Sequence, residues 1–510
     1  MRRYDYYSEW SRYAYEQEDK RFVTDDEIIN GLCVCTAPDE KRYEGSGIPV
    51  LCKGNRIYSI KDGHTMVEGE SGSKKSRTIV RDTIISVVLN GDSAIVTDPK
   101  GELSSDPKIL GLIREHDYEC PVLDFRTFDK DGFNVFKYPF ELIKEGNESE
   151  AMALISRFVS GLMDGKKTND DYWNDSAYSL LAHSIEILLT ALVQKPLGLE
   201  SANILSLLNF IANNRIELEE LMETLSKAYP KDEIHNPAEL LRRKIYSAPE
   251  KTYNCIVSVT MAMVKNFVVQ NNLAKMLSVS TFDIRDAYRK PMILFIVVPD
   301  ETKAYDEIAG QIIDSMYQQL ISEYTKCYQN IKESERKIYF ICDEFCNLRI
   351  NDMSAKVSAS RSRNITWILI YQSGKQLRDA YENDAGTIVG NCKNYIFLGS
   401  SDVDALKDVS DMCGTTYITQ GGREEYLMHV GDLRKMKKKR EYKDALFVRD
   451  NVIYCAKLPD YEQFKFLDKY ANGKHIFVNK VNSVGIYKPM ELILDVEMGA
   501  VVFPYKKNSK

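Results

Sequence analysis

Apolar and polar residues alternate along residues 61–149 in a way that predicts strands and helices in turn. Apolar runs typical of buried strands occupy HTMVEG (64–69), SAIVTDPKGEL (93–103) and CPVLDF (120–125). Between the first two, KSRTIVRDTIISVVLNG (75–91) carries an apolar side at helical spacing and ends at an Asn-Gly pair, which favours helix termination. This alternation is typical of an α/β fold, a mostly parallel sheet with helices on both faces.

Helical spacing replaces the alternation between residues 150 and 282, where Asn, Lys-Pro and Ser-Ala-Pro breaks separate the pieces. We expect an all-helical domain inserted into the α/β domain. Buried strands return at 292–298, 337–345, 365–372 and 394–399, with an amphipathic helix around residues 308–320. Residues 1–60 are expected to form an arm and short strands, and residues 481–510 a tail with one more strand, a short helix and a basic end.

One stretch between the first strand and its helix, GESGSKKS (69–76), differs by one residue from the phosphate-binding loop G-x-x-x-x-G-K-[ST]. Backbone N–H groups of such a loop point inward at the positive end of a helix and bind phosphate. Lys75 would reach the β- and γ-phosphates, and the Ser76 hydroxyl would hold Mg²⁺. The alternative is a Ser/Gly-rich surface loop. The expected nucleotide-binding residues are Gly69, Glu70, Ser71, Gly72, Ser73, Lys74, Lys75, Ser76 and Arg77.

Lys74 occupies the position of the second glycine of the motif, and it allows two opposed interpretations. If the backbone there needs a conformation that only glycine adopts freely, lysine costs about 1 kcal/mol or more and nucleotide affinity falls. If the local φ is ordinary, lysine is tolerated and adds a cation near the phosphates.

Two acids follow the apolar strand of KIYFICDEF (337–345). Asp343 could hold Mg²⁺ through Ser76 or accept a hydrogen bond from metal-bound water, and Glu344 could polarise the attacking water. In isolation such a pair is often only a solvated turn. Its combination with a phosphate loop favours a magnesium ATPase, with residues 61–149 and 283–480 as the two parts of its nucleotide-binding domain.

The run SASRSRNITWILIYQS (358–373) places Arg361 and Arg363 before a strand and Gln372 at its end. Such a glutamine can sense the γ-phosphate or place the water, and such an arginine can stabilise transition-state charge in a neighbouring subunit's site. The alternative for both arginines is surface solvation.

Composition limits the remaining possibilities. The net charge of −7 excludes a protein that coats nucleic acid over its whole surface, so any such contact is local. The eleven cysteines form no C-x-x-C pair, which argues against a zinc ribbon and favours buried, reduced thiols. No apolar run approaches the roughly 18 residues of a membrane span. The tyrosine-rich N-terminus lacks a signal-peptide core and is expected to be a polar arm that could bind a partner.

Six segments together resemble one known family. From about Ile48 to about Leu458 the chain is similar to the coupling proteins of bacterial conjugation and type IV secretion, and most closely to their branch on mobile elements of Gram-positive bacteria. The segments are HTMVEGESGSKKS (64–76), SAIVTDPKGEL (93–103), DYWNDSAYSLLAHSIEILL (171–189), FICDEF (340–345), RSRNITWILIYQS (361–373) and IVGNCKNYIFLGS (388–400).

The resemblance implies a RecA-like P-loop ATPase that forms a hexameric ring, uses ATP and Mg²⁺ and translocates DNA. Gly69, Gly72, Lys75 and Ser76 would then form the phosphate loop. Asp343 would hold the metal, Glu344 would be the catalytic base, Gln372 the γ-phosphate sensor and Arg361 the finger across the ring interface, with Arg363 as second choice. Trp173, Asn174 and Asp175 would begin the all-helical domain, which faces substrate and accessory factors. The implied partners are single-stranded or relaxase-bound DNA and a secretion-channel or membrane-anchor protein.

The chain departs from this family in two places. Family members usually begin with transmembrane helices, whereas a polar arm stands here. We therefore expect a cytoplasmic protein that either is recruited to the inner face of the membrane by a partner or works away from the membrane. The second departure is Lys74, which puts ATP hydrolysis in doubt without removing any other motif residue.

The segment LRKMKKKREYK (433–443) concentrates seven basic residues and one acid on an acidic chain. It could follow a phosphate backbone, with binding that falls steeply as salt rises. The alternative is a solvated connector near the end of the ATPase domain.

Three functions fit these observations. The leading hypothesis is a coupling-protein-like ATPase that moves or presents DNA or a nucleoprotein. The second is a non-catalytic docking scaffold whose phosphate loop is degenerate. The third is a soluble DNA translocase in defence or repair.

Overall fold

The computed structural model divides the chain into two compact units. The first unit comprises Met1–Val122, Arg285–Lys303 and Tyr324–Ile476, and the second comprises Leu123–Ile284, Ala304–Glu323 and Phe477–Lys510. The residues that it describes are 20–163, 169–196, 198–228, 235–327, 336–418, 423–436, 438–439, 441–470, 484–489, 491–492, 495 and 498. The predicted polar arm and the basic end of the tail lie outside the described residues. The domain boundaries expected from the sequence, including those at residues 150 and 282, remain predictions.

A ten-stranded sheet forms the centre of the first unit, with strand order β1-β16-β15-β12-β6-β11-β10-β7-β9-β8. Its strands are β1 (Arg21–Phe22), β6 (Thr65–Glu68), β7 (Ser93–Thr97), β8 (Val122–Asp124), β9 (Ile293–Val297), β10 (Ile338–Cys342), β11 (Ile365–Tyr371), β12 (Asn394–Phe397), β15 (Tyr442–Arg449) and β16 (Val452–Pro459). The six strands from β12 to β9 in this order pair in parallel. The mostly parallel α/β sheet that the sequence predicts is therefore confirmed.

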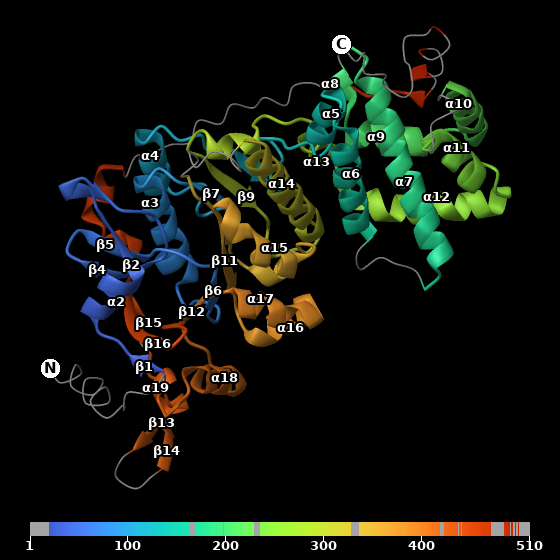
Figure 1. The fold of residues 1–510 in the computed structure, drawn as a ribbon. Helices are drawn as coiled ribbons and strands as arrows, with labels where there is room; N and C mark the ends of the chain where they lie inside the picture. Colours follow the sequence, from blue (N-terminus) through green and yellow to red (C-terminus); the bar gives the residue numbers. More distant parts are fainter. Residues whose placement is uncertain are drawn as a thin grey trace. The chain divides into compact units, whose positions relative to one another are not determined.

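The parallel strands are apolar because both of their faces are covered. All five residues of β10 are buried, and β10 pairs with β11 in a register that sets Phe340 opposite Trp367. Their rings stack with centroids 4.2 Å apart in the core. Helices α3 (Arg81–Leu89) and α4 (Pro107–Glu115) cover one face, and α15 (Met353–Ala359), α16 (Gly374–Tyr381) and α17 (Ala385–Asn391) cover the other (Figure 1).

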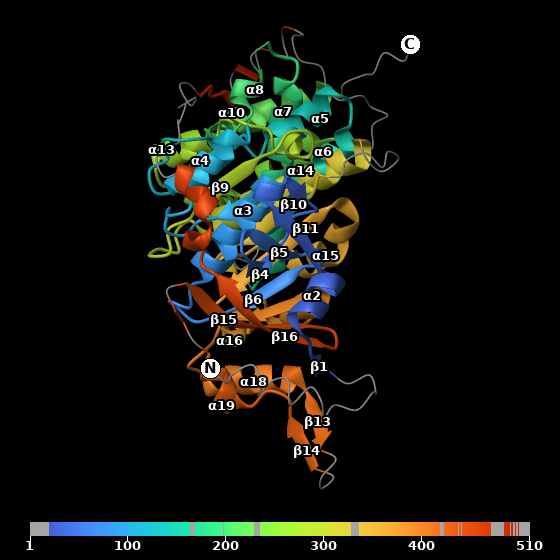
Figure 2. The ribbon, with the colours of Figure 1, turned by 90° about the vertical axis from the view of Figure 1, so that its left-hand side faces the viewer.

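Helix α3 is buried at all nine positions, which its one-sided apolar pattern does not predict. A four-stranded sheet of β2 (Cys33–Ala37), β3 (Arg42–Tyr43), β4 (Pro49–Lys53) and β5 (Arg56–Ile60) covers its outer side (Figure 2). Ser86 links the two layers, since its hydroxyl accepts from the Gly47 N–H at 3.2 Å and lies 3.3 Å from the Ser59 hydroxyl. The sequence predicts short strands within residues 1–60, but it does not predict that they form the layer that buries the helix after the phosphate loop.

An antiparallel hairpin, β15–β16, extends the sheet beyond β12 and was not predicted. The two strands are joined by Asp450 and Asn451, and Asp450 has a φ of +50°. A two-residue Asp-Asn connection between alternating apolar runs is a hairpin signal that the sequence does contain. The hairpin matters for function because its second strand leads to Asp460, described below.

The second unit is built from helices around α7 (Asp171–Leu192), whose first two turns carry Trp173, Asn174 and Asp175. The Asp170 carboxylate caps α7 by accepting the Tyr172 N–H at 2.9 Å. The other helices of this unit include α5 (Lys137–Lys144), α6 (Glu148–Met163), α8 (Gly198–Ser201), α9 (Ile204–Ile211), α10 (Arg215–Ala228), α11 (Pro237–Leu241), α12 (Glu250–Val264) and α13 (Asn271–Met276). Helices α6, α9, α11 and α12 pack on α7, which explains why 13 of its 22 residues are buried.

The structure bears on the expectations about membrane-spanning helices and about the cysteines. Within the described ranges, no helix combines the length and apolarity that crossing a bilayer requires. All eleven cysteines are free thiols. The expectation that they are buried holds for only four of them, is wrong for Cys255, which is exposed on α12, and is not met by the other six, which are partly exposed. The four buried cysteines are Cys35, Cys342, Cys346 and Cys413.

Candidate functional site

The loop of residues 69–76 begins where β6 ends, between the carboxyl ends of β11 and β12. The Gly69 N–H donates to the Tyr371 carbonyl and the Glu70 N–H donates to the Gly399 carbonyl, each at 3.2 Å. A Cβ atom on Gly69 would lie 2.6 Å from the Ser73 hydroxyl, so only glycine fits. Both neighbouring strands therefore fix the start of the loop.

Two successive turns of the loop use the left-handed region of φ. Gly72 has a φ of +75° and Lys74 a φ of +71°. A left-handed conformation costs a residue with a side chain roughly 1–2 kcal/mol, and glycine avoids this cost. The interpretation in which the backbone at position 74 favours glycine is therefore the one that the structure supports, and the interpretation with an ordinary φ is wrong.

The side chain of Lys74 binds a carboxylate far along the chain. Its Nζ donates to Asp460 Oδ2 at 2.8 Å and to the Lys439 carbonyl at 2.7 Å. Arg77 also donates to Asp460, from Nε at 2.9 Å and from Nη2 at 2.8 Å. Burial raises the pKa of Asp460, but the hydrogen bonds from Arg77 and Lys74 outweigh it, so this pKa lies below its usual range. The side chains of Lys74 and Arg77 thus hold a buried anion, and their expected roles in nucleotide binding remain predictions.

Three predicted catalytic residues, Asp343, Glu344 and Gln372, meet at the carboxyl ends of β10 and β11. The Ser76 hydroxyl donates to Asp343 Oδ2 at 2.9 Å, and the Gln372 amide donates to the two Glu344 oxygens at 3.1 and 3.0 Å. Lys75 is buried, donates to the Gly69 carbonyl at 2.7 Å and lies 3.8 Å from Glu344. Residues expected to act together from positions far apart in the sequence therefore form one cluster.

Topology explains this convergence. Asp343 follows β10 and Gln372 follows β11, and these parallel neighbours end at the same edge of the sheet. The Thr97 hydroxyl, at the end of β7, donates to the Asp343 carbonyl at 2.8 Å and fixes the turn. Burial, and next the charge of Glu344, raise the pKa of Asp343 to about 6. A cation at this position would lower that pKa by favouring the carboxylate.

The donor set fits a magnesium nucleotide. The Ser73 hydroxyl is buried inside the loop and has no hydrogen-bond partner in the part of the chain that the structure describes. Hydroxyl and carboxylate oxygens, as on Ser76 and Asp343, are the ligand types that Mg²⁺ prefers. Among the described residues, the Lys75 ammonium contacts a loop carbonyl and a carboxylate, both of which a phosphate could replace.

Glu68 is a site residue that the sequence analysis did not identify. It lies at the end of β6, is buried, and accepts from the Tyr395 hydroxyl at 2.9 Å and the Gly374 N–H at 3.3 Å. Burial raises its pKa. It ties β6 to β12 and to the start of α16, next to Gln372. A charged residue at the end of an apolar strand was the available signal.

Arg361 and Arg363 lie at the other edge of the sheet. Both belong to the 3₁₀ turn Ser360–Arg363 that precedes β11, whereas the phosphate loop follows the parallel strand β6. The Arg361 side chain is 59% exposed and lies 3.4 Å from Asp62, and Arg363 donates to the Ala359 carbonyl at 2.7 Å. The structure therefore does not bring either arginine to the phosphate loop of its own chain.

The basic segment of residues 433–443 contacts the phosphate loop. The Lys438 ammonium donates to the Gly72 carbonyl, and the Lys439 carbonyl accepts from Lys74. Lys443 is the second residue of β15 and is buried, which lowers its pKa. Lys438 and Lys439 are exposed but contact the loop, so this part of the basic segment belongs to the surroundings of the loop.

Comparison with known proteins gives a family and a fold. The family described as Type IV secretory system Conjugative DNA transfer matches residues 14–446. The plasmid coupling protein TrwB in complex with ADP and Mg²⁺ is 16% identical with a TM-score of 0.57, over 91% of this chain and 97% of that chain. An unbound form of the conjugative coupling protein TrwBdeltaN70 is 17% identical with a TM-score of 0.56, over 90% and 97% of the two chains. No curated protein sequence matches the chain. At these identities the solved structures show the shared fold alone, while the family match covers most of the chain. The protein belongs to the type IV secretory system conjugative DNA transfer family.

Proposed function

We propose that the protein is an ATPase of conjugative DNA transfer that uses the phosphate loop of residues 69–76 to move or present DNA or a nucleoprotein substrate. The observation that carries this proposal is the cluster of Lys75, Ser76, Asp343, Glu344 and Gln372, joined by hydrogen bonds of 2.9–3.1 Å and one ion pair of 3.8 Å. The coupling protein TrwB has been described with ADP and Mg²⁺ and with an ATP analogue, which supports ATP and Mg²⁺ as cofactors here.

Each residue of the cluster has a role that follows from its contacts. Ser76 and Asp343 would hold Mg²⁺, which neutralises phosphate charge when bound. Lys75 would exchange its bond to the Gly69 carbonyl for phosphate oxygens. Glu344 would accept the proton of the attacking water. Gln372 would orient the Glu344 carboxylate by donating to both of its oxygens.

Arg361 suits a site in a second copy of the chain. It is exposed and lies at the sheet edge opposite its own phosphate loop, so a role in hydrolysis would require the site of a neighbouring subunit. We therefore propose a homo-oligomeric ring in which Arg361 stabilises transition-state charge across the interface. Proposed partners are DNA, single-stranded or bound to a relaxase, and a channel or anchor protein that recruits a cytoplasmic protein to the membrane.

The left-handed lysine favours one second candidate, a docking scaffold whose phosphate loop binds nucleotide weakly. The conformation of Lys74 disfavours the observed loop by about 1–2 kcal/mol. Against this candidate, Lys75, Ser76, Asp343, Glu344 and Gln372 are all present and lie together.

Replacement of the base tests the proposal. Wild type should hydrolyse ATP with Mg²⁺, and single-stranded DNA should increase the rate. Glu344→Gln should reduce the rate at least about 100-fold because the general base is lost, while nucleotide binding remains. The measurement is phosphate release by purified protein, with the exposed Glu145→Gln as the matched control. If folded wild type and Glu344→Gln both release no phosphate, the result would support the docking scaffold instead.

Mixing of variant subunits tests the proposed role of Arg361 in the site of a neighbouring subunit. Arg361→Ala should reduce hydrolysis by about 1,000-fold without loss of nucleotide binding, because transition-state charge loses its partner. Mixing Arg361→Ala with Glu344→Gln subunits should restore part of the activity, since some interfaces then combine an intact glutamate with an intact arginine. Arg363→Ala is the comparison. Normal activity of Arg361→Ala in the assembled protein would exclude this role.

A pair of substitutions at position 74 isolates the backbone cost. Lys74→Gly and Lys74→Ala both lose the bond to Asp460, but only glycine accepts a φ of +71° without strain. Lys74→Gly should therefore be more stable than Lys74→Ala by about 1 kcal/mol, or about 2 °C in the thermal unfolding midpoint. Lys41, exposed with a φ of +52°, provides the calibration pair Lys41→Gly and Lys41→Ala. No difference at position 74, beside a clear one at position 41, would contradict the left-handed assignment.

A further inference from the structure

Three side chains of the second unit meet on the surface of α7, far along the sequence from the phosphate loop. His183 and Glu186 lie one helical turn apart on the same face of α7, and His235 lies two residues before α11. One potential ligand atom from each residue lies within 4.8 Å of the other two. The chain has only six histidines, so a meeting of two of them with a carboxylate calls for an explanation.

The ring of His183 is oriented for ligand binding. Its Nδ1 lies 2.8 Å from the Ser179 carbonyl. A carbonyl oxygen can only accept, so Nδ1 carries the proton and Nε2 keeps its lone pair. Metal-binding histidines commonly donate their second ring nitrogen to such an acceptor, which fixes the tautomer and the ring orientation.

His235 is positioned by the residue that follows it. The Asn236 side chain caps α11 by accepting the Glu239 N–H at 3.0 Å, and it donates to the Ser226 carbonyl of α10 at 3.0 Å. The backbone beside His235 is thus tied to two helices. Its ring reaches Glu186, with Nε2 at 2.8 Å from Oε1.

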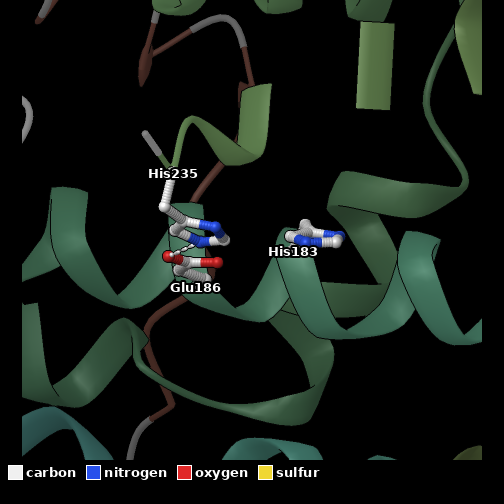
Figure 3. Close-up of side chains that lie close together, drawn as sticks. All are labelled: His183, Glu186 and His235. Atoms are coloured by element: carbon white, nitrogen blue, oxygen red, sulfur yellow. Dashed lines mark hydrogen bonds and ion pairs between the residues drawn. The ribbon is translucent and has the colours of Figure 1, made fainter. Parts of the chain in front are cut away.

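Figure 3 shows the imidazole of His235 beside the Glu186 carboxylate and the ring of His183 at the side of this pair. The two rings have centroids 5.8 Å apart and are inclined by 35°. A hydrogen-bonded pair of His235 and Glu186 alone would not explain the approach of the second imidazole, whereas a shared cation does.

We propose that His183, Glu186 and His235 bind a divalent transition-metal ion, with Zn²⁺ as the best match. Two imidazoles and one carboxylate are a recognised ligand set for Zn²⁺, which leaves the fourth tetrahedral position for water or another ligand. Zinc bonds of about 2.0–2.1 Å require ligand atoms roughly 3.3 Å apart. Rotation of side chains closes the observed separations, and His235 is exposed enough to rotate.

The metal would replace the proton between His235 and Glu186 and would join α7 to the chain that enters α11. Lys244 lies nearby and donates to the Ser179 hydroxyl at 3.1 Å and to the Asp175 carbonyl at 3.3 Å. Its charge weakens the attraction for a cation, so we expect moderate affinity. The site lies entirely within the second unit, and the inference does not depend on ATP hydrolysis.

The test uses the full chain after treatment with a chelator. Equilibrium dialysis against Zn²⁺ should give one ion per chain, and His235→Ala and Glu186→Gln should each weaken binding by at least about tenfold. The His235 side chain is 55% exposed, so His235→Ala keeps the test valid if His183→Ala or Glu186→Gln does not fold. His116→Ala is the matched control, because His116 Nδ1 also bonds a carbonyl one turn back, that of Leu112 at 3.0 Å, outside the cluster.

Spectroscopy distinguishes a metal ion bound at this site from one bound by cysteine thiolates. Bound Co²⁺ should show the visible bands of a tetrahedral ion without a thiolate charge-transfer band, and Zn²⁺ should raise the unfolding midpoint of wild type but not that of His235→Ala. Absence of binding, equal binding by wild type and both variants, or a thiolate charge-transfer band would each overturn the proposal.

Discussion

The buried carboxylate of Asp460 is the contact on which the shape of the phosphate loop depends. It receives the Lys74 ammonium and two N–H groups of Arg77, all within 2.9 Å. Hydrogen bonds to charged groups contribute roughly 1.5–3 kcal/mol each, which is enough to offset the 1–2 kcal/mol that a left-handed lysine costs. Lysine at the glycine position of the motif is therefore held in the required conformation by a residue far along the chain.

The same contact connects two parts of the first unit. Asp460 follows the β15–β16 hairpin at the end of the sheet, and the basic segment before that hairpin also contacts the loop through Lys438 and Lys439. Since the Lys74 side chain is engaged by Asp460, the additional cation beside the loop is Lys438. The C-terminal part of the unit thus completes a site whose phosphate loop, acids and glutamine follow β6, β10 and β11.

The sequence predicts the local elements well, because apolar periodicity and turn residues act over a few positions. The strands before the loop, before Asp343 and before Gln372 follow directly from such patterns, and parallel pairing then brings their ends together. It does not predict the partner of Lys74, because nothing near residue 460 marks that aspartate. The left-handed φ of Lys74 and the approach of His235 to α7 could not be predicted from the sequence either, because both depend on contacts between distant segments.

The measurement that tests the central claim most directly is the dissociation constant of a non-hydrolysable ATP analogue with Mg²⁺, for wild type beside Lys75→Ala. The account predicts saturable binding by wild type and at least about tenfold weaker binding by the variant, since an ionic contact to phosphate is worth about 1.4 kcal/mol or more. A folded wild type that does not bind, or a Lys75→Ala variant that binds equally well, would contradict the claim that the loop held by Asp460 is a working nucleotide site.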